Sequence, residues 1–267
     1  MIRAELVKMT KQLIVNADDF GMTAGVCEGI RVAAQRGKVT STTSMMCFPG
    51  SLDRARQHYK GLKIPSGVHL QLTGGKPLTP QMAELCNERH NGAFPRWPGE
   101  MAFPPDRVFV EWCAQVDCFI ENLGTPSHLD SHHHVHRIPS LIDAFLAVAQ
   151  RYRLPVRGDG SEFTQKARSL GVVTADVVDE GWTETGATAE TLIETIEAAF
   201  AVAPKGLVEI VVHPGFSDDE LRRVSSLSDI RTHELHVLCS SVLDDYLKRE
   251  AILLIDYRTL ARKGLRP

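Results

Sequence analysis

Apolar runs alternate with amphipathic stretches along most of the chain. Residues 12–18 (QLIVNAD) are typical of a buried strand, and residues 22–37 then space their apolar positions as a helix that ends at Gly37. The same order recurs to the end of the chain. Further strands are expected at 39–48, 66–73, 127–132, 154–158, 171–178, 206–214 and 251–257. Further helices are expected up to about residue 60 and at 106–123, 138–152, 161–169, 188–202 and 231–248.

Strands that alternate with helices predict a parallel sheet. Seven or eight such units in one chain favour an α/β fold of TIM-barrel type, a single closed or nearly closed (β/α) barrel, over an open sheet. No repeat or linker divides the chain, so we expect one domain over residues 1–267, with a polar leader at 1–11. Residues 74–105 break the rhythm with prolines and glycines, and they are interpreted as a loop insertion that can act as a lid.

Composition and charge narrow the class of protein. The chain is 43% hydrophobic and 24% charged, which is ordinary for a globular protein, and its net charge of −3 makes nucleic acid an unfavourable partner. Its apolar runs are too short to span a membrane, and residues 1–11 do not have the pattern of a secretory signal. The six scattered cysteines have neither zinc-site nor disulfide-framework spacing, so we expect reduced thiols in a cytoplasmic protein.

Polar residues interrupt the apolar strands near their carboxyl ends, where functional residues of parallel α/β folds gather. The recurrence of this placement in five strands indicates a site. The residues concerned are Asn16, Asp18, Asp19, His69, Asp130, His132, Arg157 and His213.

The segment NADDFG (16–21) places two adjacent carboxylates at a strand end. If both were ionised in a pocket of low dielectric constant they would repel each other, so a positive group is expected beside them. A metal ion would be such a group, and one aspartate would then be free to act as a base. The alternative is an aspartate that caps the next helix, with Gly21 allowing the turn.

Five histidines crowd the segment SHLDSHHHVH (127–136), and strand periodicity separates them. His128, Asp130 and His132 share one face of the expected strand, with His132 nearest the open end and best placed as a metal ligand. Asp130 is then a candidate supporting carboxylate for His132. The remaining three can pack, bind substrate or face solvent, and the simplest alternative for the whole segment is a solvated loop.

Two isolated histidines complete the candidate chemistry. His69 lies at an inward strand position, where a hydrogen-bonded core histidine is the alternative to a ligand. His213 ends a buried strand before Pro214 and suits a general acid, or else a structural residue bonded to a loop carbonyl. One aspartate with two histidines is a plausible ligand set for a divalent ion, which would activate water and polarise a carbonyl for amide or ester hydrolysis.

Several motifs, in this order, resemble the YdjC-like carbohydrate deacetylases, a family that includes chito-oligosaccharide deacetylases and deacetylases associated with hopanoid biosynthesis. The similarity runs from about residue 12 to the end of the chain and is weak in 74–105 and 160–200. The motifs are LIVNADDFG, GKVTSTT, GVHLQLTGGKPL, SHLDSHHHVH, VVHPGF and IDYRTL.

The resemblance implies a distorted barrel that binds one divalent metal ion, Mg²⁺ or Zn²⁺, and removes N-acetyl groups from an amino sugar, a chito-oligosaccharide or a sugar conjugate. It also implies a homodimer. By position, Asp19, His69 and His132 match the family's metal ligands. Asp18 matches the base, His213 the acid, and Arg157 the arginine that orients them. The division of roles between Asp18 and Asp19 stays open, because both lie in one motif.

Other functions remain as alternatives from the residues alone. The same metal site could serve a phosphodiesterase or a glycosidase, although a glycosidase needs a second flanking carboxylate outside the aspartate pair. A non-catalytic sugar-binding protein on the same barrel is a third hypothesis. Candidate sugar contacts, for which packing is the alternative role, are Phe94, Trp97, Trp112 and Trp182.

Overall fold

The computed structural model describes residues 10–159, 162–203 and 205–264. Most of the expected leader, residues 1–11, therefore lies outside the described residues. Among the residues that are described, no helix is both long and apolar enough to cross a membrane.

Seven strands in the described residues form one parallel sheet, in the order β4-β3-β2-β1-β6-β5, and β7 pairs with the start of β1. Between the edge strands β4 and β5 there are only two isolated bridges, Leu129 to Val156 and Val156 to Thr174. The sheet curls into a half-barrel, so the parallel α/β fold expected from the sequence is confirmed but the closure of a barrel of seven or eight strands is not. The strands are β1 (Gln12–Phe20), β2 (Ser41–Ser44), β3 (Ser66–Leu70), β4 (Leu129–Ser131), β5 (Val177–Asp179), β6 (Leu207–Val212) and β7 (Leu253–Leu254).

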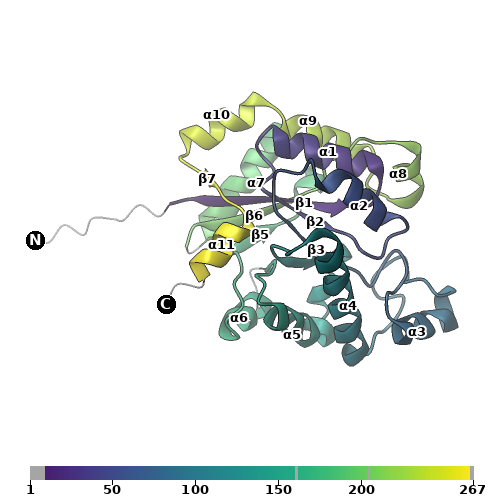
Figure 1. The fold of residues 1–267 in the computed structure, drawn as a ribbon. Coiled ribbons are helices and arrows are strands. Elements are labelled where there is room, and N and C mark those ends of the chain that lie inside the picture. The colour runs from purple at the N-terminus through teal and green to yellow at the C-terminus, as the bar shows by residue number, and fades with distance from the viewer. Residues whose placement is uncertain (1–9, 160–161, 204, 265–267) are drawn as a thin grey trace, which may run out of the picture.

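Helices cover the outside of the sheet (Figure 1), with α1, α7, α9 and α10 packed on one side and α4 and α5 on the other. Two extensive apolar cores fill the space between these helices and the strands. The helices are α1 (Ala24–Gln35), α2 (Ser51–Tyr59), α3 (Pro80–His90), α4 (Pro105–Leu123), α5 (Ile142–Tyr152), α6 (Glu162–Ser169), α7 (Ala189–Val202), α8 (Asp219–Val224), α9 (Ile230–Leu238), α10 (Ser241–Arg249) and α11 (Tyr257–Gly264). Three 3₁₀ segments are η1 (His132–Arg137), η2 (Pro139–Leu141) and η3 (Trp182–Thr185).

The inner face of the half-barrel is mostly polar, because alternate residues of each strand point inward. On β1, Leu13, Val15 and Ala17 belong to the outer core, whereas Asn16 lies inside and bonds Ser41 and Asp18. A small apolar cluster that joins Ile14 to Ile255 and α11 packs below this polar layer. The polar interior thus opens toward the carboxyl ends of the strands.

Several boundaries differ from the sequence expectation. The insertion 74–105 is not a continuous loop, since it contains α3, which buries Met82 and Cys86 four residues apart on one face. The single helix expected at 231–248 is two helices, α9 and α10, separated at residues 239–240. Three expected strands are shorter than predicted. The strand expected at 154–158 is only an isolated bridge at Val156, and the strand expected at 171–178 consists of a bridge at Thr174 and β5. The strand expected at 251–257 is the two-residue β7.

Candidate active site and metal centre

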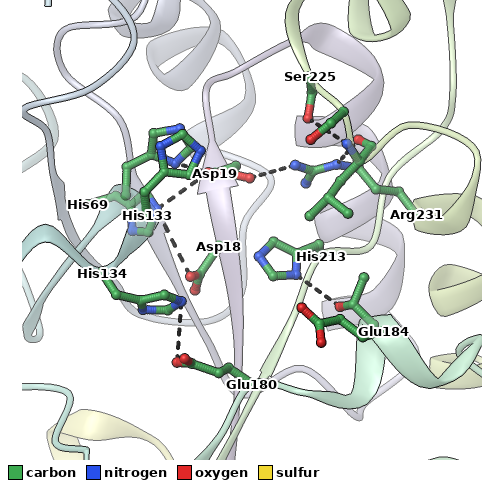
Figure 2. Close-up of a pocket in the computed structure, with 14 residues that line it drawn as sticks. Asp18, Asp19, His69, His133, His134, Glu180, Glu184, His213, Ser225 and Arg231 are labelled. Carbon is green, nitrogen blue, oxygen red and sulfur yellow. Dashed lines mark hydrogen bonds and ion pairs between the residues drawn. The ribbon is translucent and has the colours of Figure 1, made fainter. Parts of the chain in front are cut away.

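A cavity of about 250 Å³ lies at the carboxyl ends of the strands, and its inner wall is formed by titratable side chains (Figure 2). Five of the residues expected from the sequence line it together, although they lie far apart along the chain. These residues are Asp18, Asp19, His69, His132 and His213.

Asp19 occupies an unusual position on β1. Its backbone φ of 70° lies in the left-handed region, beside an irregularity in the pairing of β1 with β2. This conformation directs Oδ1 to within 3.4 Å of His69 Nε2 and 3.2 Å of His132 Nδ1. Asp19 Oδ1 is buried without a hydrogen-bond partner, whereas Oδ2 accepts a hydrogen bond of 2.6 Å from Arg231.

One oxygen and two ring nitrogens therefore converge, with the ligand atoms of Asp19, His69 and His132 all within 4.8 Å of one another. A buried carboxylate oxygen without a donor is costly unless a cation is close. The mixed O/N donor set suits a divalent metal ion. These three residues could hold such an ion.

His69 is oriented by Asp130, because its Nδ1 donates a hydrogen bond of 2.7 Å to Asp130 Oδ1. Burial by itself would lower the pKa of His69, but the negative charges of Asp130 and Asp18 raise it to about 10. The surroundings of this ring thus favour positive charge. The bond leaves Nε2 facing Asp19. Asp130 therefore supports His69, whereas the strand pattern had suggested that it supports His132.

Asp18 is held by Arg157, which donates two hydrogen bonds of 2.7 and 2.6 Å to its two oxygens. Asn16 donates a third, of 2.8 Å, to Oδ1. Burial would raise the pKa of Asp18, but the charge and hydrogen bonds of Arg157, with smaller contributions from His69 and His213, hold it well below its usual range. Asp18 therefore stays ionised.

Arg157 is fully buried and does not line the cavity, so it acts through the groups that it contacts. Besides Asp18 it bonds Asp130 at 2.9 Å and Glu209 at 2.9 Å, and Glu209 also accepts a hydrogen bond from Tyr257. A second grouping, of Asp18, His69 and Asp130, is also compact enough for a metal ion. Its carboxylates are already paired with Arg157, which favours the set that contains Asp19.

His213 follows β6 and lines the same cavity, where its ring lies beside Asp18 in the view of Figure 2. Its Nδ1 lies 3.3 Å from the Thr183 hydroxyl, and its backbone N–H donates to Glu234. Thr183 in turn donates a hydrogen bond of 2.6 Å to Glu234. These contacts fix the position of His213. Because Nδ1 is the ring nitrogen that contacts Thr183, the other ring nitrogen, Nε2, is not used in this contact.

The five clustered histidines divide into two groups. β4 ends at Ser131, so His132 begins η1, and the left-handed backbone of His133 and His134 (φ 52° and 51°) brings all three to the cavity. His128 and His136 are fully buried instead. His128, a candidate from the sequence for supporting the site or contacting the substrate, stacks on Tyr257 with a centroid distance of 3.7 Å and is not among the residues that line the cavity.

Sequence reasoning missed several cavity residues, above all Arg231, which is 1% exposed and bonds Asp19. A signal was available. On α9 the charged residues Arg231 and Glu234 share the buried stripe with Leu235 and Leu238, at helical spacing. Glu180 and Glu184 also line the cavity, and Glu180 lies 3.2 Å from His134 Nε2. Both glutamates follow β5, and this strand is so short that its carboxyl end could not be located from the sequence.

The four aromatic candidates for sugar contacts separate clearly by burial. Trp112 and Trp182 are fully buried and Phe94 is 5% exposed, so all three pack in the cores. Trp97 is 41% exposed and lies beside the cavity.

Comparison with known proteins identifies the family of this chain. The family model described as YdjC-like protein matches residues 12–249. The chain belongs to the YdjC-like family. Among family relatives, a carbohydrate deacetylase from Geobacillus stearothermophilus is 36% identical over 252 residues, which cover 94% of this chain and 98% of the relative. A chitooligosaccharide deacetylase from Proteus mirabilis is 35% identical over 260 residues, covering 94% and 100%.

Solved structures support the fold of this YdjC-like chain. A crystal structure from Enterococcus faecalis, described as a cellobiose-phosphate cleavage protein, superposes with a TM-score of 0.82 at 32% identity and covers 94% of this chain and 99% of that one. A CE4 esterase from Streptococcus mutans gives a TM-score of 0.51 at 12% identity, covering 92% and 87%. The second likeness concerns the fold alone.

Proposed function

We propose that the protein is a metal-dependent carbohydrate deacetylase that removes N-acetyl groups from an amino sugar, an acetylated chito-oligosaccharide or a related conjugate. One observation carries the proposal. Asp19 Oδ1, which has no hydrogen-bond partner, converges with His69 and His132. The same cavity also contains His213 and the ionised carboxylate of Asp18. The names of the family relatives, carbohydrate deacetylase and chitooligosaccharide deacetylase, agree with it.

Asp19, His69 and His132 would hold one divalent ion, Mg²⁺ or Zn²⁺, and the donor set fits either. When bound, such an ion lowers the pKa of water and polarises an amide carbonyl. The proton on His69, which its carboxylate neighbours otherwise favour, would give way to the ion.

The remaining chemistry belongs to side chains of this chain. Asp18 takes a proton from the attacking water, and Arg157 keeps the Asp18 carboxylate ionised and aimed. Water adds to the acetamide carbonyl carbon, and the C–N bond then breaks. His213 Nε2 gives a proton to the leaving nitrogen, so the products are acetate and a free amine.

The first experiment is a screen for acetate release from N-acetylglucosamine and its short β-linked oligomers. We expect acetate and no shortening of the oligomer. We also expect a chelator to remove the activity and added Mg²⁺ or Zn²⁺ to restore it, because Asp19 Oδ1 has no hydrogen-bond partner and Arg231 bonds only Oδ2. Release of shorter sugars without acetate would instead support a glycosidase that uses Glu180 or Glu184, which also line the cavity.

Replacing Asp130 with alanine is expected to weaken metal binding by about 10–100-fold, because outer-shell carboxylates orient ligating histidines and raise their basicity. Titration calorimetry of the chelator-treated protein with Zn²⁺ or Mg²⁺ measures the effect. Asp130→Asn keeps an oxygen 2.7 Å from His69 Nδ1 and should lose less. The control is Asp53→Ala, at a side chain that is 88% exposed. A dissociation constant equal to that of the wild type would contradict the support of His69 by Asp130.

A further inference from the structure

Trp97 is the most conspicuous aromatic residue near the cavity. It stays 41% exposed although it stacks on His133, with ring centroids 5.0 Å apart, and although Arg96 lies 5.6 Å from its ring centroid. His133 stacks in turn on His132, at 3.9 Å. A continuous row of three rings therefore runs from a proposed metal ligand to the surface.

The segment that carries Trp97 is fixed to the body of the protein. Gly74 and Phe94 donate backbone hydrogen bonds of 3.0 and 2.9 Å to Pro95 and Gly75 respectively, and the Phe94 side chain is buried. Gly75 packs so closely that an added Cβ would lie 2.2 Å from the carbonyl oxygen of Cys47. Trp97 is thus part of a built rim, and its exposure is a property of the fold.

A second, smaller hollow of about 60 Å³, lined by Trp97 and Arg96, lies next to the main cavity. The two hollows share His132, His133, Ser225 and Ser226 as lining residues. The cavity of about 250 Å³ is below the roughly 300–1,000 Å³ usual for sites that enclose a drug-sized ligand. One acetylated sugar unit is small enough for a cavity of this size, and the adjoining hollow gives the next unit of an oligomer a place to lie.

We propose that this hollow is a second sugar subsite, with Trp97 as its platform. The proposal rests on the proposed function. With the acetamide of one unit beside Asp19 and His132, the neighbouring pyranose packs its C–H face against the indole. Arg96 and the hydroxyls of Ser225 and Ser226 line the same hollow and can bond the sugar hydroxyls. The substrate class is then an acetylated oligosaccharide of two or more units, in preference to a free amino sugar.

The test compares Trp97→Ala with Trp97→Phe on N-acetylglucosamine and on diacetylchitobiose. Loss of an aromatic contact should lower the ratio of kcat/KM for the disaccharide to that for the monosaccharide by about tenfold in Trp97→Ala. Trp97→Phe should retain most of the ratio. The matched control is Val202→Ala, which trims an apolar side chain that is 69% exposed at the end of α7.

An unchanged ratio in Trp97→Ala would overturn the subsite, even if both rates fell equally through a disturbed His133. Calorimetric binding of diacetylchitobiose separates this failure from failure of the proposed function. If the wild type releases no acetate but binds the disaccharide, and Trp97→Ala binds it about tenfold more weakly, the subsite stands and the deacetylase proposal falls. If the wild type does not bind the disaccharide, the subsite proposal is wrong.

Discussion

Asp18→Asn is expected to lower the rate of deacetylation by about 10²–10⁴-fold, the usual contribution of a general base. Asparagine cannot take a proton from water at neutral pH, whereas Arg157 keeps the wild-type carboxylate ionised. The proposed ligand set of Asp19, His69 and His132 is left intact, so the variant should bind a divalent metal ion as the wild type does. Acetate release and metal titration, made on the same preparation, measure the two effects separately.

The matched comparison is Asp19→Asn, made on the adjacent residue. Asp19 Oδ1 is the oxygen without a hydrogen-bond partner, so this variant should lose metal affinity and activity together. Asp53→Asn makes the same chemical change on an exposed helix and serves as the control for both. If Asp18→Asn deacetylates as fast as the wild type, or if only Asp18→Asn loses the metal, the assignment of base and ligand is wrong.

Arg157→Met is expected to have the largest effect on stability, a loss of about 3–5 kcal/mol in the free energy of unfolding. Arg157 is fully buried and contacts the carboxylates of Asp18, Asp130 and Glu209, at 2.6 to 2.9 Å. Removing it leaves these negative charges buried without their common partner. Urea unfolding in the presence of a chelator measures the loss, with Arg222→Met, at a side chain that is 49% exposed, as the control.

The pH dependence of this loss has a definite sign. In the wild type Arg157 depresses the pKa of Asp18 below its unfolded value, so the stability that Asp18 contributes is lost as the pH falls through that range. In Arg157→Met burial dominates and raises the pKa above the unfolded value, so the folded variant takes up protons. The deficit relative to the wild type should therefore shrink between about pH 8 and about pH 5. A deficit that does not change with pH would show that Arg157 stabilises by packing alone.

Strand periodicity accounts for most of what could be predicted from the sequence. It places His69 and Asp130 on the inner face, because a side chain's face in a strand follows from parity alone. His132 lines the cavity as well, but it does so from η1, because β4 ends one residue earlier than expected and left-handed residues follow. Parity predicts a face, but it does not predict where a strand stops.

The individual hydrogen-bond partners of residues in distant segments could not be predicted from these patterns. Asp130 bonds His69 and not His132, because β3 and β4 are paired with His69 opposite Asp130. Arg231 reaches Asp19 from 212 residues away, and only its place on the buried stripe of α9 hinted at a role. The boundaries of the short strands were predicted poorly for a further reason. Strands of two and three residues, such as β7 and β5, have too few positions to show an alternating pattern.

The uneven burial of the tryptophans also makes the intrinsic fluorescence of the protein a probe of the rim at Trp97. The chain has three tryptophans, and Trp112 and Trp182 are sealed in the cores while Trp97 stands 41% exposed at the rim. Sealed indoles emit at shorter wavelength and are shielded from quenchers such as acrylamide, so the quenchable, red-shifted emission belongs to Trp97. Fluorescence of the unlabelled protein therefore reports directly on what covers this rim.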